Sequence, residues 1–192
     1  RHSRHVLLPQ VGAEGQAKIS KARILCVGAG GLGSPVVQYL AAAGIGHLTI
    51  IDDDRVEISN LQRQVIHGKS EIGILKAESA KRFVYKLDPS VSVDAIAERL
   101  DKSNAENLFR GHDIIIDGTD NIQTRYLIDD TCKILGLPWV YGSVYRFEGQ
   151  VSVFNYKGGP CYSDLFPEAP PPELVPSCSE AGVLGVLPGF IG

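Results

Sequence analysis

The chain has 192 residues, of which 44% are hydrophobic and 21% are charged, and its formal net charge is −3. These proportions are ordinary for a globular protein, and a slightly negative charge gives no reason to expect a nucleic-acid-binding surface. No segment offers the roughly 20 apolar residues that a helix needs to span a bilayer. None resembles a secretory signal. We therefore expect a cytoplasmic protein.

The four cysteines, at positions 26, 132, 161 and 178, are widely spaced along the chain. Cys26 lies in an apolar strand pattern and Cys132 in a helical pattern, where buried free thiols are common. This usage fits a reducing compartment better than a disulfide framework.

Short apolar runs alternate with segments of helical periodicity through most of the chain. Such an alternation predicts an α/β fold, a Rossmann-like, doubly wound and mostly parallel sheet with helices on both faces. A serine and a proline begin the first helix of this pattern, and Gly44 ends it. The predicted strands are 23–28, 47–51, 91–96, 112–118, 138–143 and 149–156, and the predicted helices are 34–44, 70–87, 101–109 and 121–136.

The composition changes after Tyr156. Residues 158–176 are rich in proline, which excludes a helix or a central strand and predicts an extended crossover loop. The chain begins with Arg1, contains no methionine and stops just as a new apolar segment begins. We expect residues 1–192 to be one nucleotide-binding domain and a fragment of a longer protein.

The sequence GAGGLG at residues 28–33 fits the G-x-G-x-x-G pattern between a strand and a helix. Gly28 would allow the tight turn, Gly30 would let the backbone approach a phosphate or ribose, and Gly33 would permit close helix–strand packing. Asp52 follows about 20 residues later at the end of the next strand, where such folds hold a ribose. These features together predict a nucleotide site.

The residues after Asp52 favour a triphosphate over a nicotinamide dinucleotide. Asn60, Arg63 and Lys76 supply cationic and amide groups, and three phosphates carry more charge than a pyrophosphate bridge. No G-x-x-x-x-G-K-[ST] pattern occurs, so a P-loop is excluded. The competing interpretation is that Arg63 and Lys76 are solvated surface charges, as most such residues are.

A second acidic pair, Asp117 and Asp120, ends the fourth predicted strand at the carboxyl edge of the sheet. A carboxylate there can hold a magnesium ion that bridges phosphate oxygens. The alternative for Asp120 is a helix N-cap, because a helix is predicted to start directly after it.

The motifs as a set resemble the ThiF/MoeB/HesA group of adenylyltransferases, which is related to the ubiquitin-activating enzymes. The resemblance extends from Arg1 to Gly192. The motifs that carry it are GAGGLGSP, DDDRVEISNLQRQ, LKAESAK, DGTDNIQTRY, RFEGQV and PSCSEAGVLGVLPG.

This resemblance implies ATP- and Mg²⁺-dependent adenylation of the C-terminal glycine carboxylate of a small ubiquitin-like sulfur carrier ending in Gly-Gly. Asp52 would hold the ribose and Gly31 would let the backbone pass close to the nucleotide, while Asp120 would bind Mg²⁺. Arg4 matches a family arginine that reaches the phosphates of the partner subunit in a homodimer. The phosphate contacts would come from Asn60, Arg63 and Lys76, and the matched motifs add Asp54, Ser59, Leu61, Gln62 and Asn121 to the cofactor-binding set.

The resemblance also bears on a covalent step and on zinc. Cys178 matches a cysteine that in some relatives attacks the adenylate or carries sulfur as a persulfide; the alternative is a packed thiol. Many relatives bind zinc through two cysteine pairs, but here Asp164 stands where the second cysteine of the first pair, begun by Cys161, would be. One Cys and one Asp make a poor tetrahedral site, so we expect no zinc. The C-x-x-D form resembles the MoeZ-like subgroup that is fused to a rhodanese domain, which would lie beyond residue 192 and act as sulfur donor.

Two other functions remain as alternatives. An NAD(P)-dependent oxidoreductase rests only on the glycine loop and Asp52, and nothing after Asp120 resembles an acid–base pair for hydride transfer. A non-catalytic subunit of an activating enzyme would tend to lose the phosphate-contacting residues, and here they are present. The pathway, whether molybdopterin, thiamin, thiolated tRNA or cysteine synthesis, is left open.

Overall fold

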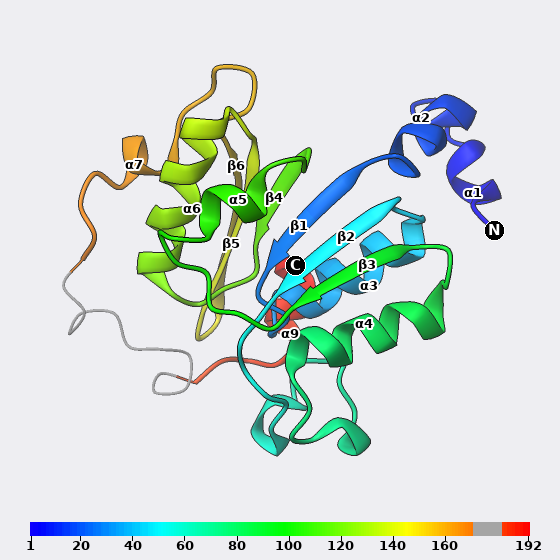
Figure 1. Cartoon of the computed structure of the whole chain (residues 1–192), viewed down its shortest axis with the longest axis horizontal. Coiled ribbons are helices and arrows are strands. Elements are labelled where there is room, and N and C mark those ends of the chain that lie inside the picture. The colour runs from blue at the N-terminus through cyan, green and yellow to red at the C-terminus, as the bar shows by residue number, and fades with distance from the viewer. Residues whose placement is uncertain (171–181) are drawn as a thin grey trace.

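The computed structural model describes residues 1–170 and 182–192, and its described part is built around a six-stranded sheet of order β3-β2-β1-β4-β5-β6 (Figure 1). The first five strands are parallel, as predicted, and the last pairs antiparallel with its neighbour through a hairpin. The strands are β1 (Arg23–Val27), β2 (His47–Ile51), β3 (Ser92–Ile96), β4 (Ile114–Asp117), β5 (Trp139–Tyr145) and β6 (Glu148–Phe154).

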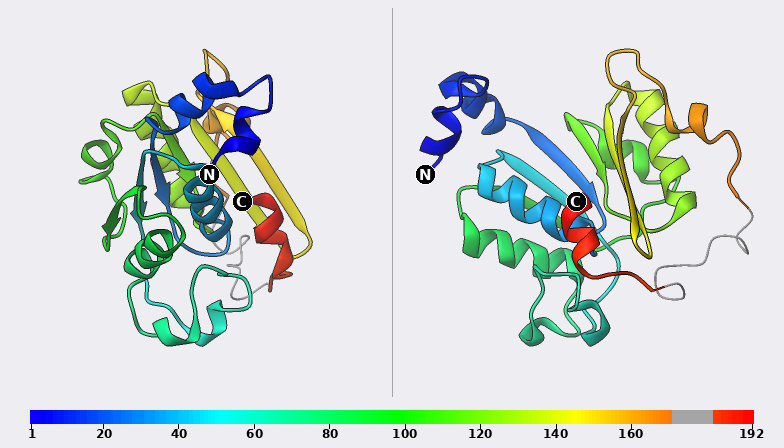
Figure 2. Two further views of the ribbon diagram at one scale, coloured as in Figure 1. Left: turned by 90° about the vertical axis from the view of Figure 1, so that its right-hand side faces the viewer. Right: turned by 180° about the vertical axis from the view of Figure 1, so that it is seen from behind.

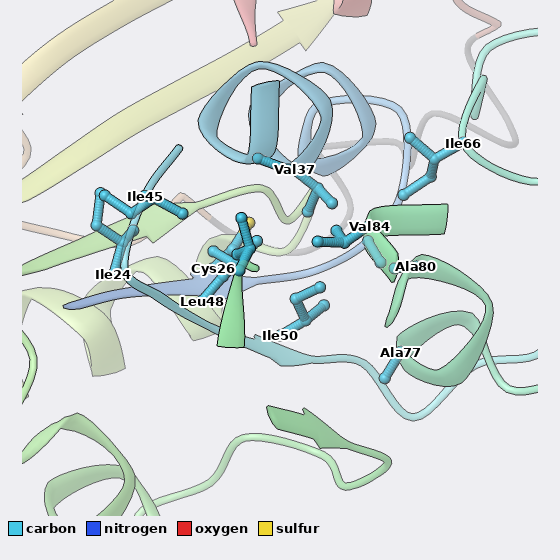
Figure 3. Packing of buried hydrophobic residues seen from close by; sticks show 13 residues of the cluster. Ile24, Cys26, Val37, Ile45, Leu48, Ile50, Ile66, Ala77, Ala80 and Val84 are labelled. Atoms are coloured by element: carbon cyan, nitrogen blue, oxygen red, sulfur yellow. The ribbon is translucent and has the colours of Figure 1, made fainter. Parts of the chain in front are cut away.

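Helices cover both faces of the sheet, because successive residues of the central strands are buried and point to opposite sides. Helices α3 (Gly33–Ala43) and α4 (Lys76–Leu87) pack on one face, where Figure 3 shows Cys26, Leu48 and Ile50 beneath Val37 and Val84. Helices α5 (Ala105–Phe109) and α6 (Ile122–Leu135) pack on the other, against Leu25, Ile115, Trp139 and Phe154. The predicted α/β class and its two helix layers are confirmed.

Three local elements differ from the sequence prediction. Helix α4 begins at Lys76 and not near residue 70, because a 3₁₀ turn (Lys69–Glu71) and an extended Leu75 precede it. A short helix, α7 (Tyr162–Leu165), interrupts the proline-rich segment expected to be wholly extended. The first 22 residues form two further helices, α1 (Ser3–Val6) and α2 (Gly12–Ile19), and the described C-terminal part ends in α9 (Val186–Ile191).

The two N-terminal helices lie at the amino edge of the sheet. Arg1 forms an ion pair with Asp88, just beyond the C-terminal end of α4, and Gln16 donates a hydrogen bond to the carbonyl of Ala43 at the end of α3. Helices of a βαβ unit run antiparallel to its strands, so these ends lie opposite the carboxyl edge of the sheet. Figures 1 and 2 show α1 and α2 far from α9, which lies near the carboxyl ends of the strands. None of the helices in residues 1–170 and 182–192 is long and apolar enough to cross a membrane.

Candidate nucleotide-binding site

The glycine turn after β1 meets the loop after β4 at the point where the strand order reverses. Gly28 has φ +94°, and a Cβ atom on it would lie 2.9 Å from the carbonyl oxygen of Gly118. A Cβ on Gly33 would collide with the Gly28 carbonyl oxygen. Only glycine therefore allows these two loops and the start of α3 to approach so closely, and this crevice is where open α/β sheets bind ligands.

A cavity of about 400 Å³ opens at this crevice, along the carboxyl edge of the sheet. The turn contributes Gly28, Gly30 and Gly31 to its lining, whereas Gly33 lies outside the lining and serves the packing of α3. Of the other residues predicted to bind the nucleotide, the cavity lining includes Asp52, Asp54, Asn60, Arg63, Lys76, Asp120 and Asn121 and excludes Ser59, Leu61 and Gln62.

Asp52 is tied to the glycine turn. Its Oδ2 accepts a 2.7 Å hydrogen bond from the N–H of Ala29, and its Oδ1 accepts one of 2.9 Å from the N–H of Asp54. Burial raises the pKa of Asp52, and these two backbone donors and the charge of Lys76 oppose that rise. A carboxylate oxygen has a second lone-pair site, so each oxygen can also accept a hydroxyl of a bound ribose.

Two cations reach the cavity from the segment after β2. Lys76, the first residue of α4, is buried, and its Nζ lies 2.7 Å from Oδ2 of the exposed Asp54. The side chain of Arg63 passes close to Gly31, where an added Cβ would meet its Cδ at 3.4 Å, and its Nη1 donates to the carbonyl of Ser59. Lys76 is thus not a solvated surface charge, which was the competing interpretation of its sequence.

The two acidic residues after β4 have different environments. Asp117 is buried, accepts the Nε–H of Arg125 at 3.1 Å, and also accepts the hydroxyl and N–H of Thr119. Asp120 is exposed on the cavity and makes no side-chain hydrogen bond or ion pair with residues 1–170 or 182–192. The N-cap of α6 is Asn121, whose Oδ1 accepts the N–H of Thr124, so the N-cap alternative for Asp120 was wrong.

An unpaired carboxylate on a polyanion-sized cavity is the kind of hard oxygen ligand that Mg²⁺ takes, so Asp120 fits a magnesium site. Among the described residues, Asp52, Asp53 and Asp54 also bring carboxylate oxygens within 4.8 Å of one another. Asp52 accepts a hydrogen bond from the glycine turn, and Asp54 is paired with Lys76. Asp120 is therefore the better candidate for a magnesium ligand.

The sequence motifs did not single out several residues that line the cavity. Gln64 is buried, and its Oε1 has no hydrogen-bond partner among residues 1–170 and 182–192. Arg99 follows β3, whose carboxyl end meets the same edge, and that strand position was a signal that could have found it. Val183 and Pro188 of the C-terminal segment also line the cavity; they lie in the motif PSCSEAGVLGVLPG, but nothing in their spacing indicates that they return to the glycine turn.

Arg4, like Gly33, Ser59, Leu61 and Gln62, does not line the cavity. Arg4 lies on α1 at the opposite edge of the sheet, as described above. Cys178 lies outside the described residues. At the position of the family's first zinc pair, Asp164 accepts a 2.7 Å hydrogen bond from the N–H of Cys161.

Comparisons with known proteins identify the family of the chain. The ThiF family model matches residues 2–192. The chain is 52% identical over 192 residues to the SAMP-activating enzyme E1 of Haloferax volcanii, covering all of this chain and 71% of that protein. It is 48% identical over 197 residues to the sulfur carrier protein adenylyltransferase of Thermus thermophilus, covering all of this chain and 73% of that protein. It is 51% identical over 191 residues to the probable adenylyltransferase/sulfurtransferase MoeZ of Mycobacterium tuberculosis, where 97% of this chain matches 49% of that protein.

Solved structures show the same fold over about half of their length. An E. coli MccB complex has a TM-score of 0.74 at 26% identity, covering 80% of this chain and 46% of that chain. The E. coli tRNA N6-threonylcarbamoyladenosine dehydratase TcdA, solved in complex with ATP, has a TM-score of 0.68 at 26% identity, covering 72% of this chain and 57% of that chain. The strand order, the glycine turn and these matches lead to one conclusion: the chain belongs to the ThiF family and is of the MoeZ-like adenylyltransferase type.

Proposed function

We propose that this domain uses ATP to adenylate the C-terminal glycine carboxylate of a ubiquitin-like sulfur-carrier protein. The observation that carries the proposal is the convergence of Arg63, Lys76 and Asp120 on the cavity that also contains Asp52 and the glycine turn. The cations Arg63 and Lys76 can bind a polyphosphate, and the carboxylate of Asp120 can bind its metal ion. A nicotinamide site needs neither the extra cations nor a metal ligand. The names of the Haloferax and Thermus relatives, an activating enzyme and a sulfur-carrier adenylyltransferase, support the same substrate class.

The nucleotide would lie with its ribose at Asp52 and its phosphates toward Arg63 and Lys76. Val27, Ile51 and Leu100 give the cavity an apolar wall beside Asp52, which is suited to an adenine ring. The ATP complex of TcdA supports ATP as the ligand of this crevice. Mg²⁺, held by Asp120, would neutralise phosphate charge when bound.

The reaction brings a carboxylate anion up to a polyanion, so charge compensation and alignment are the main tasks of the protein. A carboxylate oxygen of the carrier attacks the α-phosphorus, the bond from that phosphorus to the bridging oxygen breaks, and pyrophosphate leaves with the electron pair. Lys76 and Arg63 stabilise the charge that accumulates on the phosphate oxygens. The carrier retains an acyl adenylate that a sulfur nucleophile can attack.

The experiment that tests this function is exchange of labelled pyrophosphate into ATP. We expect exchange that needs Mg²⁺ and a carrier with a free C-terminal Gly-Gly, and none when the terminal glycine is deleted. Carrier-independent exchange, or ATP binding without exchange across several Gly-Gly carriers, would contradict the proposal. A carrier-independent absorbance change with nicotinamide cofactors would favour an oxidoreductase instead.

The proposal includes a homodimer in which Arg4 acts on the partner subunit's phosphates. The position of α1, at the edge of the sheet opposite the cavity, supports a role outside its own site. Mixing Arg4→Ala and Lys76→Ala subunits should restore part of the activity through hybrid sites, because one site in each mixed dimer then has both cations. If activity does not recover although the subunits are proven to exchange, Arg4 has no role in the partner's site and is an ordinary surface residue.

A later sulfur-transfer step belongs to the same proposal. Cys178 would be the residue that attacks the adenylate or carries sulfur, and the printed names of MoeZ and of the UBA4 protein of Yarrowia lipolytica join adenylyltransferase to sulfurtransferase. Both are about twice as long as this chain, which covers 49% and 48% of them. We therefore propose that the chain is the adenylyltransferase domain and that a rhodanese domain would supply the sulfur.

A further inference from the structure

One buried histidine joins the glycine turn to the two other elements that face the phosphates. His67 Nε2 lies 2.9 Å from the carbonyl oxygen of Ala29 in the turn. His67 Nδ1 lies 2.8 Å from the hydroxyl of Ser79 on α4, the helix that begins with Lys76. His67 itself belongs to the segment that carries Asn60 and Arg63. The residue is 6% exposed and does not line the cavity, so its contacts act on neighbouring groups and not on a ligand.

The hydrogen-bonding groups determine which ring nitrogen carries the proton. A carbonyl oxygen only accepts, so Nε2 must donate to Ala29. Burial holds the pKa of His67 below its ordinary value, which favours the neutral ring. The Ser79 hydroxyl donates to Oε2 of Glu71 at 3.0 Å, and Nδ1 of the neutral ring lies 2.8 Å from its oxygen. Glu71 Oε2 also accepts the N–H of Gly68 at 2.9 Å, which ties the segment after His67 to the same cluster.

Ala29 is thereby held from both sides of its backbone. Its N–H donates to Asp52, and its carbonyl accepts from His67. Gly28 and Gly30, the neighbours of Ala29, both line the cavity. Since glycine has more conformational freedom than any other residue, a turn rich in glycine depends on such external bonds for its shape. Among the described residues, the hydrogen bond from His67 to Ala29 joins the turn to the segment that carries Asn60 and Arg63.

We propose that His67 is a positioning residue for ATP, which sets the glycine turn against the segment of Asn60 and Arg63 and against the start of α4 through its Nε2–H bond to Ala29. The inference deepens the proposed adenylation and rests on it. The charged groups that face the ring are Glu71, Lys76 and Asp52. The ionised carboxylates have no proton to donate, and Nζ of Lys76 is bonded to Asp54. In the described part of the chain, no other side-chain donor bonds the Ala29 carbonyl.

The chemistry of the imidazole offers a matched pair of variants. The amide nitrogen of Gln reaches the position of Nε2, so His67→Gln retains a donor for Ala29 and loses the partner of Ser79. The amide of Asn reaches the position of Nδ1, so His67→Asn retains a partner for Ser79 and loses the donor to Ala29. Both variants remove the ring and the titration. His112→Asn is the control for general loss of a half-buried histidine, because His112 bonds Thr49 and Phe109 and does not line the cavity.

The measurements are the KM for ATP and kcat in pyrophosphate exchange, the Kd of a non-hydrolysable ATP analogue without carrier, and the thermal midpoint of unfolding. We expect His67→Asn to raise the ATP KM and the analogue Kd about tenfold, the scale of one lost well-placed hydrogen bond. In His67→Gln, the ATP KM and the analogue Kd should stay within about twofold of those of the unmodified protein. Its thermal midpoint of unfolding should nevertheless fall as much as that of His67→Asn. His112→Asn should lower stability alone.

Equal ATP affinities of His67→Asn and His67→Gln would overturn the inference. So would a loss of kcat in proportion to the unfolded fraction with KM unchanged, because that pattern describes a purely structural residue. Failure of the proposed function has a different signature. The unmodified domain would then bind the analogue, with His67→Asn weaker than His67→Gln, and still show no exchange with any Gly-Gly carrier.

Discussion

Lys76 Nζ lies 2.7 Å from Asp54 Oδ2, and the lysine is buried while the aspartate is exposed. The aspartate therefore fixes the ammonium group at the wall of the cavity in advance of any ligand. A cation that is already in place needs no reorganisation when phosphate charge develops, which is where electrostatic catalysis gains most. The same contact also joins the acidic run after β2 to the first turn of α4.

The first prediction concerns this pair. Lys76→Ala should lower the rate of pyrophosphate exchange about 10²- to 10³-fold, the usual scale for removing one charge-stabilising group. Asp54→Asn should cost less, about tenfold, because the lysine remains and loses only its alignment. Exchange kinetics with saturating carrier measure both. Equal and small losses in the two variants would show that the lysine does not act on the phosphates.

The second prediction separates the two carboxylates after β4. Asp117→Asn should lower the free energy of unfolding by about 3–5 kcal/mol, because it leaves the buried Arg125 without its counter-charge. Asp120→Asn should change that free energy by no more than about 0.5 kcal/mol, and yet it should raise the Mg²⁺ concentration needed for exchange. Urea denaturation and a Mg²⁺ titration test the pair. An unchanged Mg²⁺ requirement in Asp120→Asn would remove this residue from the metal site.

The third prediction uses Gln64, whose buried Oε1 lacks a partner in the described part of the chain. Gln64→Glu keeps the shape and adds a negative charge to the wall of a cavity proposed for a polyanion. We expect the ATP KM to rise at least about tenfold, from like-charge repulsion in a partly desolvated site. Gln62→Glu is the matched control, because Gln62 is exposed and outside the cavity lining. Similar ATP KM values in both variants would contradict the prediction.

The fourth prediction concerns acid stability and His112. Burial lowers the pKa of His112 below its ordinary value, and the charge of Arg23 lowers it further. The unfolded chain, with a histidine pKa of about 6.5, then binds a proton that the folded chain resists. The free energy of unfolding should therefore decrease as the pH falls from about 7 through about 6.5 and on to the lowered pKa. In His112→Gln this slope should be shallower, as urea denaturation at several pH values would show; an unchanged slope would contradict the assignment.

The sheet, and the edge of the sheet at which the nucleotide site lies, could be predicted from the sequence because they depend on local patterns. Short apolar runs marked the strands, and Gly44 and Gly136 marked the helix ends, where both have a left-handed backbone. The chemistry of the nucleotide site also followed from residue types at strand ends, since the carboxyl ends of parallel strands meet at one edge. Asp52, after β2, and Asp120, after β4, could be placed at one edge on that basis.

Other features depended on contacts between distant segments. No local pattern indicates that Arg125 on α6 pairs with Asp117 and leaves Asp120 unpaired, or that Asn121 caps that helix. The start of α4 was predicted too early, because Leu75 ends an extended approach that is held by the bond from the N–H of Lys76 to the Asp54 carbonyl. The helices before β1 had too short an apolar pattern to be recognised.

The sequence by itself therefore determined the fold class, the glycine turn and the chemical character of the nucleotide site, since periodicity and residue type are local properties of the chain. The tertiary structure alone decided which of two neighbouring aspartates is unpaired within the described part of the chain, how deeply Lys76 is buried, and which histidine joins the glycine turn to α4. Those outcomes depend on desolvation and on hydrogen-bond partners that lie far apart in sequence, such as His67 and Ala29. Such contacts form only when the chain folds.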